Sequence, residues 1–398
     1  MPRFEPFAGL RYADTVDLAA ATSPPYDVID PDERAALAAR HDRNVVRIDM
    51  PVDGDDPYAE AAATLARWQA DGTLVTDDAP SFYAYRMTYV DEQDNPRDTT
   101  GILGGLGLEP PGEGDVLPHE HTTPKAKSDR LDLLRSTHHN LSPIWGLSLA
   151  TGLSALVDIS EPPLAEVTDE LGVVHALWRV TDEAVIASIS GVVASAPVVI
   201  ADGHHRFETS LAYRNEVRAA NGDQAGPWDL TLALVVELTE DELAVRPIHR
   251  LLDDLPGDVD LSLALAPFFD IVPAPEADLT LTDAMAELGA LALVREGGHA
   301  WLLRPRPEAF PDDMPDLDSS RLDVARATLG DHRVTYQHGT DNVLRKVAAG
   351  EAAAGVLLRP ATVAQIEAMA HRRERMPPKT TYFHPKIRTG MLFRSLEA

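Results

Sequence analysis

The sequence predicts a folded α/β or α+β protein built on a mixed sheet. Its composition is close to that of soluble globular chains, with 44% hydrophobic and 25% charged residues. Segments with the pattern of strands also alternate with segments that have the pattern of helices. With 398 residues, the chain is long enough for about two to three domains with cores of their own.

The first quarter of the chain already mixes both kinds of element. Asp30 followed by Pro31 is typical of a helix start, so we expect a helix there. The segment "NVVRIDMP", residues 44–51, predicts a short strand, and residues 57–71 predict a second helix that ends before "DGTLV". Alternation in "SFYAYRMTYV" predicts a strand over residues 81–90, and "TTGILGGLGLE" follows after a turn.

Later elements surround two polar segments. Residues 129–137 predict a helix with its leucines facing inward, which leaves "HEHTTPKAK" before it as a loop. Residues 155–157 and 173–180 predict short strands, and residues 230–239 predict a buried strand. An apolar helix is expected before "GHAWLLRP".

A stretch rich in proline, glycine and aspartate, "DLPGDVDL", indicates a domain boundary. We therefore expect a main domain over residues 1–254 and a C-terminal α/β segment over residues 255–398. The chain closes with "RMPPKTTYFHPKIRTGMLF", which is polar and aromatic. We expect this aromatic and lysine-bearing end to return toward the polar segments of the main domain.

Charge and cysteine usage exclude several classes of protein. The formal net charge of -29 repels polyanions and anionic membrane surfaces, so neither nucleic acid nor a membrane is an expected partner. The opening "MPRFEPFAGLRYADT" lacks the apolar region of a signal peptide, and we expect a cytoplasmic protein. The absence of cysteine excludes disulfides, thiolate zinc sites and cysteine nucleophiles.

The first polar segment is "VVIADGHHRFET", residues 198–209, and it has the form of a strand, a turn and a helix. Residues 198–201 are a β-branched run of strand length, and residues 207–220 favour a helix that ends at Asn221 and glycine. Asp202 and Gly203 then form the turn. The start of a helix presents unpaired N–H groups, which makes this turn a candidate anion site.

The side chains at this turn fit the same interpretation. Gly203 lets an anion approach closely, and His204, His205 and Arg206 supply further donors. The carboxylate of Asp202 can hold a divalent cation such as Mg²⁺ or accept a proton from an attacking hydroxyl. The alternative is that Asp202 only caps the helix and that the histidines are ordinary surface donors.

The second polar segment is "PHEHTTPKAK", in which a glutamate can act as a base or metal ligand and lysines can bind phosphate. Its candidate residues are His119, Glu120, Thr122, Lys125 and Lys127. Zinc is not favoured, because the spacing of His119 and His121 does not match a helical His-Glu-x-x-His pair. The segment can also be no more than the entrance to the following helix.

Two further segments are secondary candidates for the same pocket. "PPYDV" offers Tyr26 and Asp27, and "MPPKTTYFHPK" offers Lys379 and Lys386. A structural turn is the favoured explanation of each of them. The sequence has no Walker loop and no Gly-x-Gly-x-x-Gly, so a nucleotide site has to be of another kind.

Two resemblances follow from these motifs. "FEPFAGLR", "PPYDVID", "HEHT", "ADGHHRFET" and "MPPKTTYFHPK" resemble, in this order and over nearly the full chain, the domain-of-unknown-function family one-zero-one-five. "ADGHHR" also resembles the nucleotide-binding box of the ParB and sulfiredoxin superfamily, above all its free serine kinases. The second resemblance covers a small part of the chain and implies a small ParB/sulfiredoxin-like core around the box, with flanking α/β segments.

The serine kinases place a catalytic glutamate upstream of the box, and Glu120 stands at the matching position. It lies 82 residues before Asp202 (202 minus 120), a longer gap than in those compact kinases. Sulfiredoxin needs a cysteine where His204 stands, and this chain has none. ParB proteins carry Gly-Glu-Arg-Arg in the box and bind DNA, which the charge of -29 disfavours.

The resemblance implies a phosphotransferase that moves a phosphoryl group between a nucleotide, ADP or ATP, and serine or O-phosphoserine, with Mg²⁺ on the phosphates. Asp202 and Glu120 would be catalytic, and residues 203–206 would bind phosphate, with Lys125 and Lys127 as secondary candidates. A metal-dependent phosphatase or hydrolase that uses the histidines is one alternative. A nucleotide-binding regulator without turnover is another. The sequence does not specify the direction of transfer, the nucleotide base or the oligomeric state.

Overall fold

The computed structural model describes residues 1–91, 94–110, 112–120, 127–157, 159–257, 259–274 and 276–397. The chain divides into two compact units. Unit 1 consists of Met1–Pro118, Thr122–Leu243 and Pro385–Ala398, and unit 2 of His119–His121 and Ala244–His384. Unit 2 thus begins ahead of the boundary expected at residue 254, and the last residues of the chain belong to unit 1.

Unit 1 is built on a mixed sheet, in agreement with the predicted fold class. Within the described ranges its strands follow the order β6-β11-β8-β12-β5-β4-β10-β9, and β1 pairs with β5 at the side. β6 with β11 and β8 with β12 are parallel pairs, and the other pairs are antiparallel. The strands are β1 Phe4–Glu5, β4 Phe82–Val90, β5 Pro96–Gly107, β6 Val116–Pro118, β8 Ile144–Ser148, β9 Ala165–Thr168, β10 Val174–Val180, β11 Val198–Asp202 and β12 Leu230–Glu237.

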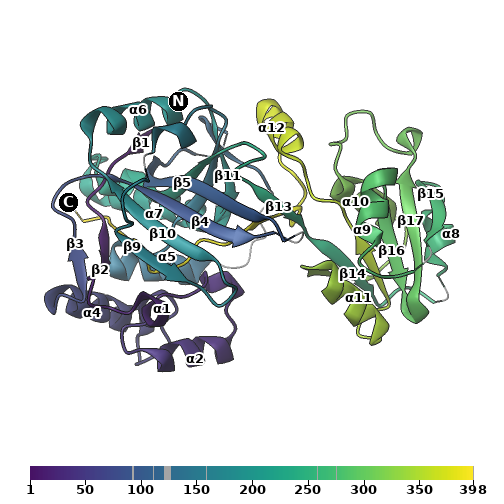
Figure 1. The fold of residues 1–398 in the computed structure, drawn as a ribbon, viewed down its shortest axis with the longest axis horizontal. Helices are drawn as coiled ribbons and strands as arrows, with labels where there is room; N and C mark the ends of the chain where they lie inside the picture. Colours follow the sequence, from purple (N-terminus) through teal and green to yellow (C-terminus); the bar gives the residue numbers. More distant parts are fainter. Residues whose placement is uncertain are drawn as a thin grey trace. The chain divides into compact units, whose positions relative to one another are not determined.

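Helices lie on both sides of this sheet (Figure 1). They are α1 Leu18–Ala21, α2 Pro31–Arg40, α3 Val46–Asp49, α4 Pro57–Ala70, α5 Lys127–Thr137, α6 Glu183–Ala194 and α7 His204–Asn221. Alternate residues of a strand point to opposite faces, so Phe82 and Ala84 of β4 pack with Ile189 of α6 in one core. Tyr83 and Tyr85 face the other side, where the Tyr83 hydroxyl donates to Asp77 and the Tyr85 hydroxyl accepts from the Arg388 N–H.

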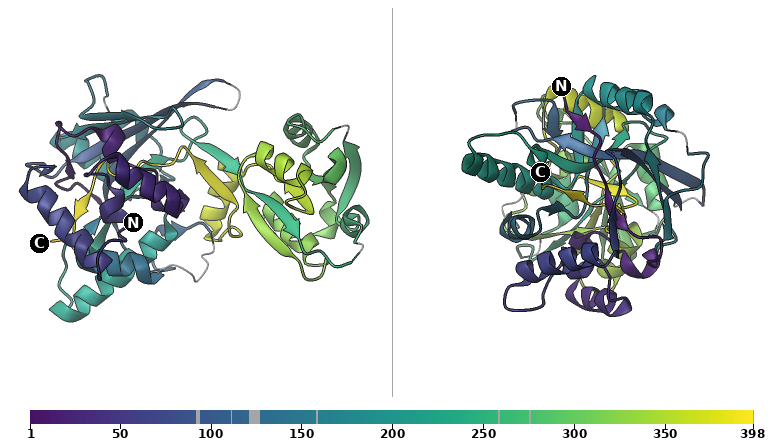
Figure 2. Two further views of the ribbon diagram at one scale, coloured as in Figure 1. Left: turned by 90° about the horizontal axis from the view of Figure 1, so that it is seen from below. Right: turned by 90° about the vertical axis from the view of Figure 1, so that its left-hand side faces the viewer.

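The closing segment of the chain packs into unit 1 beside the N-terminal segment (Figure 2). Leu10 and Phe393 form an antiparallel bridge and share one core with Trp68 of α4. Two further two-stranded pairs stabilise this region, β2 Leu10–Tyr12 with β3 Leu74–Thr76 and β7 His139–Asn140 with β21 Arg394–Ser395. Residues close to the end of the sequence are therefore fixed against its beginning.

Most predicted elements of unit 1 are confirmed, and two are wrong. α2 has a full capping box between Asp30 and Glu33, and α4, α5, β4, β10 and β12 match their expected ranges. The segment predicted as a strand over residues 44–51 instead contains the short helix α3, which buries Val46, Ile48 and Asp49, and the Asn44 side chain accepts from the Val46 N–H just before it. The strand predicted over residues 155–157 is a 3₁₀ helix, Ser154–Leu156. Local patterns this short are easily overruled by capping and packing.

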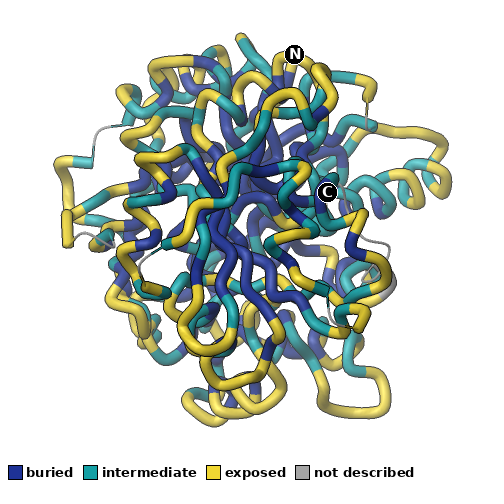
Figure 3. The backbone as a smooth tube through the Cα atoms, turned by 90° about the vertical axis from the view of Figure 1, so that its right-hand side faces the viewer, coloured by how far each residue is buried: buried dark blue, intermediate teal, exposed yellow. Residues whose placement is uncertain are grey.

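Unit 2 has its own antiparallel sheet with the strand order β15-β17-β16-β19-β14-β18 over the described part of the chain. Its strands are β14 His249–Asp253, β15 Phe269–Ala274, β16 Leu291–Arg295, β17 His299–Pro305, β18 Arg333–Gln337 and β19 Ala354–Leu357, and β13 Ala244–Pro247 pairs separately with β20 Thr381–His384. Its helices are α8 Leu261–Leu265, α9 Leu281–Leu288, α10 Asp318–Arg326, α11 Thr340–Ala348 and α12 Val363–Arg372. The strands of both units are largely buried, whereas the connecting loops are exposed (Figure 3). Among the described residues, no helix combines the length and the apolar character needed to cross a bilayer.

His249 at the start of β14 makes the stability of unit 2 depend on pH. Its side chain is 2% exposed, and its Nδ1 accepts the Leu358 N–H at 3.2 Å. Burial, with Arg250 as a further cause, lowers the pKa of His249 from about 6.5 to about 4. Between pH 6.5 and 4, His249 is therefore protonated in the unfolded chain but neutral in the folded chain. The free energy of unfolding is largest above about pH 6.5 and decreases as the pH drops toward 4.

We expect this loss to approach about 3 kcal/mol once the pH has fallen through the pKa of the folded state. Urea unfolding at a series of pH values measures it. His249→Asn keeps an acceptor for the Leu358 N–H and should flatten the dependence, whereas His371→Asn on the exposed side of α12 should not. An unchanged slope in the His249 variant would show that the loss comes from other groups.

Candidate functional site

The start of helix α7 is open to a ligand. β11 ends at Asp202, and the N-cap residue is Gly203, whose φ of 85° lies in the left-handed region. No side chain caps the helix, and the first helical hydrogen bond runs from the Phe207 N–H to the Gly203 carbonyl. The N–H groups of residues 204–206 therefore have no partner within the helix. A Cβ at Gly203 would lie 3.0 Å from both Ile144 and Arg206, so glycine also keeps this corner free.

Asp202 is held between two cations at this corner. One carboxylate oxygen accepts from Arg206 Nη2 and the other from Lys386 Nζ, both at 2.9 Å. The side chain of Asp202 is 25% exposed, so a ligand can still reach it. Burial acts to raise the pKa of this carboxyl, but Lys386 and Arg206 outweigh burial and hold it well below its usual range. Asp202 is therefore ionised at every physiological pH.

Arg206 connects this corner to the rest of unit 1. Its Nη1 donates to the Pro143 carbonyl, and its guanidinium lies 5.9 Å from the centre of the Tyr26 ring. Burial lowers the pKa of Arg206, but the field of Asp202, with those of Tyr26 and Asp27, outweighs burial and leaves the pKa raised. Arg206 Nε is buried and has no hydrogen-bond partner among the described residues. The guanidinium thus stays charged and keeps one donor unused.

The two histidines of the box add to the same positive region. His205 Nδ1 is buried and makes no hydrogen bond within the part of the chain that the structure describes. His204 lies close enough to Asp202 for its charge to lower the pKa of that carboxyl. The first turn of α7 therefore combines N–H groups that no side chain caps with imidazole and guanidinium groups beside the carboxylate of Asp202.

A second polar group lies next to Arg206 and includes residues that sequence reasoning missed. The guanidinium carbon of Arg130, in α5, lies 4.4 Å from the centre of the Tyr26 ring. The guanidinium carbon of Arg206 lies 5.9 Å from the centre of the same ring. Arg130 Nη1 donates to the carbonyl and to the side chain of Asp49, at 2.7 and 3.2 Å. Burial, partly offset by Arg130, raises the pKa of Asp49. Because residues 44–51 were predicted to form a strand, Asp49 was not identified as a candidate site residue.

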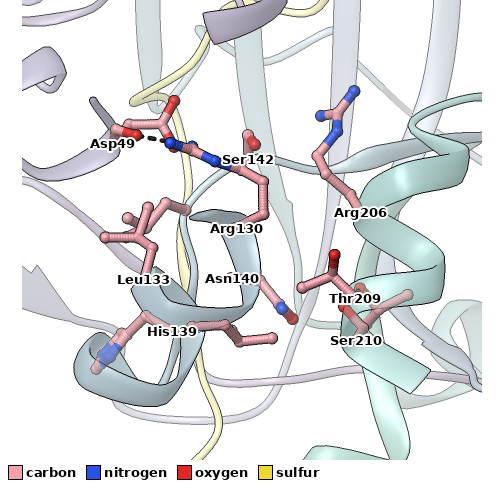
Figure 4. A pocket seen from close by; sticks show the side chains of 12 residues that line it. Asp49, Arg130, Leu133, His139, Asn140, Ser142, Arg206, Thr209 and Ser210 are labelled. Carbon is pink, nitrogen blue, oxygen red and sulfur yellow. Dashed lines mark hydrogen bonds and ion pairs between the residues drawn. The ribbon is translucent and has the colours of Figure 1, made fainter. Parts of the chain in front are cut away.

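A pocket of about 50 Å³ opens between α5, α7 and the loop that follows β7 (Figure 4). Its polar lining includes Asp49, Arg130, Asn140, Ser142, Arg206 and Thr209. Figure 4 shows the Arg206 side chain rising from the first turn of α7 at one side, with Thr209 one turn further along. Arg206 is therefore common to the pocket and to the open start of α7.

Glu120 belongs to unit 2 and binds the backbone of residues 379–381. Its Oε1 accepts from the N–H groups of Thr380 and Thr381 and from the Thr381 hydroxyl, at 2.9 to 3.1 Å. Its Oε2 accepts from the Lys379 N–H at 3.0 Å. His119 Nε2 lies 3.3 Å from Oε1 and 2.8 Å from the Thr381 hydroxyl oxygen. Burial raises the pKa of Glu120, but His119 and these donors overcome it and lower the pKa to about 2.

The predicted site residues are thus distributed over both units. Unit 1 holds the box residues together with Tyr26, Asp27 and Lys386, whereas His119, Glu120 and Lys379 are in unit 2. Thr122 and Lys125 lie outside the described residues, and Lys127 begins α5 with a side chain that is not described. Glu120 and Lys379 meet through the Lys379 backbone and not through its ammonium group. Asp202 and Lys386 meet through their side chains.

The site offers few ligands for a metal ion held by the protein alone. No group of three or more His, Asp and Glu side chains is placed to hold a metal within the described ranges. Asp202, which pairs with both Arg206 and Lys386, is the carboxylate at this corner that could bind a divalent cation.

Comparisons with known proteins give a family and several weak structural likenesses. Residues 4–325 match the family described as "Protein of unknown function (DUF1015)". No curated protein matches the sequence. A solved structure of a free serine kinase in complex with AMP has 14% identity and a TM-score of 0.39, covering 76% of this chain and 97% of that chain. A conserved hypothetical protein from Pyrococcus furiosus has 12% identity and a TM-score of 0.37, covering 70% and 92%. SbnI from Staphylococcus aureus has 10% identity and a TM-score of 0.38, covering 72% and 85%.

Proposed function

The chain belongs to the DUF1015 family, whose members are described as proteins of unknown function, and from its site we propose that it is a phosphotransferase. It transfers a phosphoryl group between ADP or ATP and a small hydroxy amino acid, serine or O-phosphoserine. The observation that carries the proposal is the uncapped start of α7 beside an ion-paired Asp202. The serine assignment rests on the Asp-Gly-His-His-Arg box, which resembles that of free serine kinases.

The first turn of α7 is proposed to bind the transferred phosphate. The N–H groups of the first turn, which no side chain caps, and the positive end of the helix dipole favour an anion there. Arg206 keeps Nε free for a further hydrogen bond, and Lys386 adds a compact positive charge. These groups neutralise charge on the equatorial oxygens of the phosphoryl group during transfer, which is the main task of a catalyst for this reaction.

Asp202 is proposed to orient the hydroxyl group that receives the phosphate. In the forward direction the serine hydroxyl oxygen forms a bond to the γ-phosphorus of ATP. The bond from that phosphorus to the β–γ bridging oxygen breaks, and ADP leaves. The hydroxyl proton passes to Asp202. A carboxylate with so low a pKa is a weak base, which suffices because the transition state is loose and the proton leaves late.

Mg²⁺ is proposed to enter with the nucleotide and to neutralise the charge of its phosphates. Each oxygen of Asp202 accepts one hydrogen bond from a cation and keeps a second lone pair. Asp202 would be the residue of this site that coordinates Mg²⁺. The cytoplasmic location expected from the sequence is consistent with ADP or ATP as a substrate.

Glu120, Lys125 and Lys127 stay predictions as further site residues. The contacts of Glu120 favour a positioning role in unit 2, because both carboxylate oxygens hold backbone N–H groups of residues 379–381. Glu120 Oε1 accepts three hydrogen bonds, whereas each oxygen of Asp202 accepts one and keeps a second lone pair for a substrate. We therefore assign proton transfer to Asp202 alone.

Phosphorus NMR of two mixtures tests the proposal: Mg²⁺ with O-phosphoserine and ADP, and Mg²⁺ with serine and ATP. We expect protein-dependent transfer in at least one of them. Release of inorganic phosphate from O-phosphoserine without ADP would support the metal-dependent phosphatase instead. Nucleotide binding without any product would support the regulatory protein. Either outcome would contradict the phosphotransferase.

A further inference from the structure

The pocket beside the start of α7 has polar groups that are left open. Thr209 is 5% exposed, and its hydroxyl is buried without a hydrogen-bond partner among the described residues. Arg130, in the same lining, donates through Nε to Asp129 and through Nη1 to Asp49. A buried polar group that makes no hydrogen bond is costly and is uncommon in folded proteins. The Thr209 hydroxyl and Arg206 Nε are such groups, and their place in one lining indicates that a ligand completes them.

Other polar groups in the lining use only part of their hydrogen-bonding capacity. Asn140 accepts the Leu232 N–H with Oδ1, which leaves its amide nitrogen available within the described structure. Ser142 also lines the pocket and brings a hydroxyl group to it. Asp49 accepts from Arg130 with Oδ1 and keeps Oδ2 open. The pocket therefore offers a carboxylate oxygen, a guanidinium donor, an amide donor and two hydroxyl groups.

The charges and the size of the pocket select the ligand. An acid and a base in one lining, Asp49 and Arg130, complement a ligand that carries both an ammonium and a carboxylate group. The space for the centres of water-sized groups is about 50 Å³, several times what one water molecule needs, so the pocket suits a small ligand. A small amino acid fits this space, whereas a nucleotide does not. The short hydroxylated side chains of serine and of close analogues meet both requirements.

We infer that this pocket is the binding site for the small zwitterionic substrate, with Asp49 facing its ammonium group and Arg130 its carboxylate. The inference rests on the proposed phosphotransferase function and assigns its acceptor site. Arg206 lines the pocket and holds Asp202 through Nη2, so the ligand hydroxyl lies on the side of the box. The nucleotide phosphate and the amino acid would thus meet at the first turn of α7.

Thr209→Val tests the pocket with little change in shape. Because the hydroxyl of Thr209 has no partner in the described structure, its loss should leave Tm unchanged or raise it. The Kd for L-serine, measured by calorimetry, should rise about tenfold, and the Kd for Mg-ADP should not change. Thr99→Val is the matched control, since its buried hydroxyl donates to the Glu242 carbonyl outside the pocket lining. It should lower Tm and leave L-serine binding intact.

The outcomes separate the pocket from the proposed function. If the protein transfers phosphate to serine and Thr209→Val leaves L-serine affinity unchanged, the pocket assignment is overturned and the function stands. If L-serine binds and Thr209→Val weakens it while no transfer occurs, the pocket stands and the function fails. If L-serine does not bind the unmodified protein, with or without Mg-ADP, the pocket assignment is wrong.

Discussion

Asp202→Asn is expected to lower kcat/KM for phosphoryl transfer by about 10² to 10⁴-fold. The amide keeps the size of the side chain but loses the negative charge that holds Arg206 and Lys386 at 2.9 Å. It also cannot take the hydroxyl proton. Transfer measured by phosphorus NMR or by a coupled assay for ADP gives the size of the loss.

The control for this variant is Asp223→Asn, just beyond the other end of α7. Asp223 is mostly exposed and pairs with Arg218, so its loss should change neither activity nor stability by a measurable amount. Circular dichroism of both variants checks that the fold is retained. Full activity in Asp202→Asn would remove Asp202 from the mechanism.

Glu120→Gln is expected to lower the free energy of unfolding of unit 2 by about 2 to 4 kcal/mol. The carboxylate accepts from three N–H groups and one hydroxyl, and an amide NH₂ at one of its oxygen positions would face a donor. Chemical unfolding measures the loss. Glu367→Gln on the exposed side of α12 is the matched control and should stay within about 0.5 kcal/mol.

Glu120→Gln also distinguishes a positioning role of Glu120 from a catalytic role. The pKa of Glu120 falls from 4.5 to about 2 on folding, so its contribution to stability is present above pH 4.5 and is lost as the pH falls toward 2. Glu120→Gln should remove this dependence. If the variant instead keeps its stability and loses transfer activity, Glu120 is a catalytic group, as the resemblance to serine kinases implies.

The strand, turn and helix around the box could be predicted because all three signals are local. A β-branched run precedes Asp202, Gly203 permits a positive φ, and residues 204–221 favour a helix. The mixed fold class followed from the alternation of patterns along the chain. The short segment of residues 44–51 was predicted wrongly, because burial of Val46, Ile48 and Asp49 and the hydrogen bond from the Val46 N–H to Asn44 favour its helical form.

The contacts within the site could not be predicted from local patterns. Lys386 reaches Asp202 across 184 positions of sequence, and Glu120 binds the backbone of residues 379–381 across about 260. Arg130 and Asp49 had no motif that distinguished them from other surface charges. Only their shared burial against Tyr26 and the pocket identifies them. The motif "MPPKTTYFHPK" was the one sequence signal that pointed to Lys386.

A crystal structure of the protein with Mg²⁺ and ADP tests the central claim most directly. We predict a phosphate group within hydrogen-bond distance of the N–H groups of residues 204–206, with Arg206 and Lys386 beside it. A nucleotide bound elsewhere in unit 1 or unit 2, with the start of α7 free of phosphate, would contradict the account.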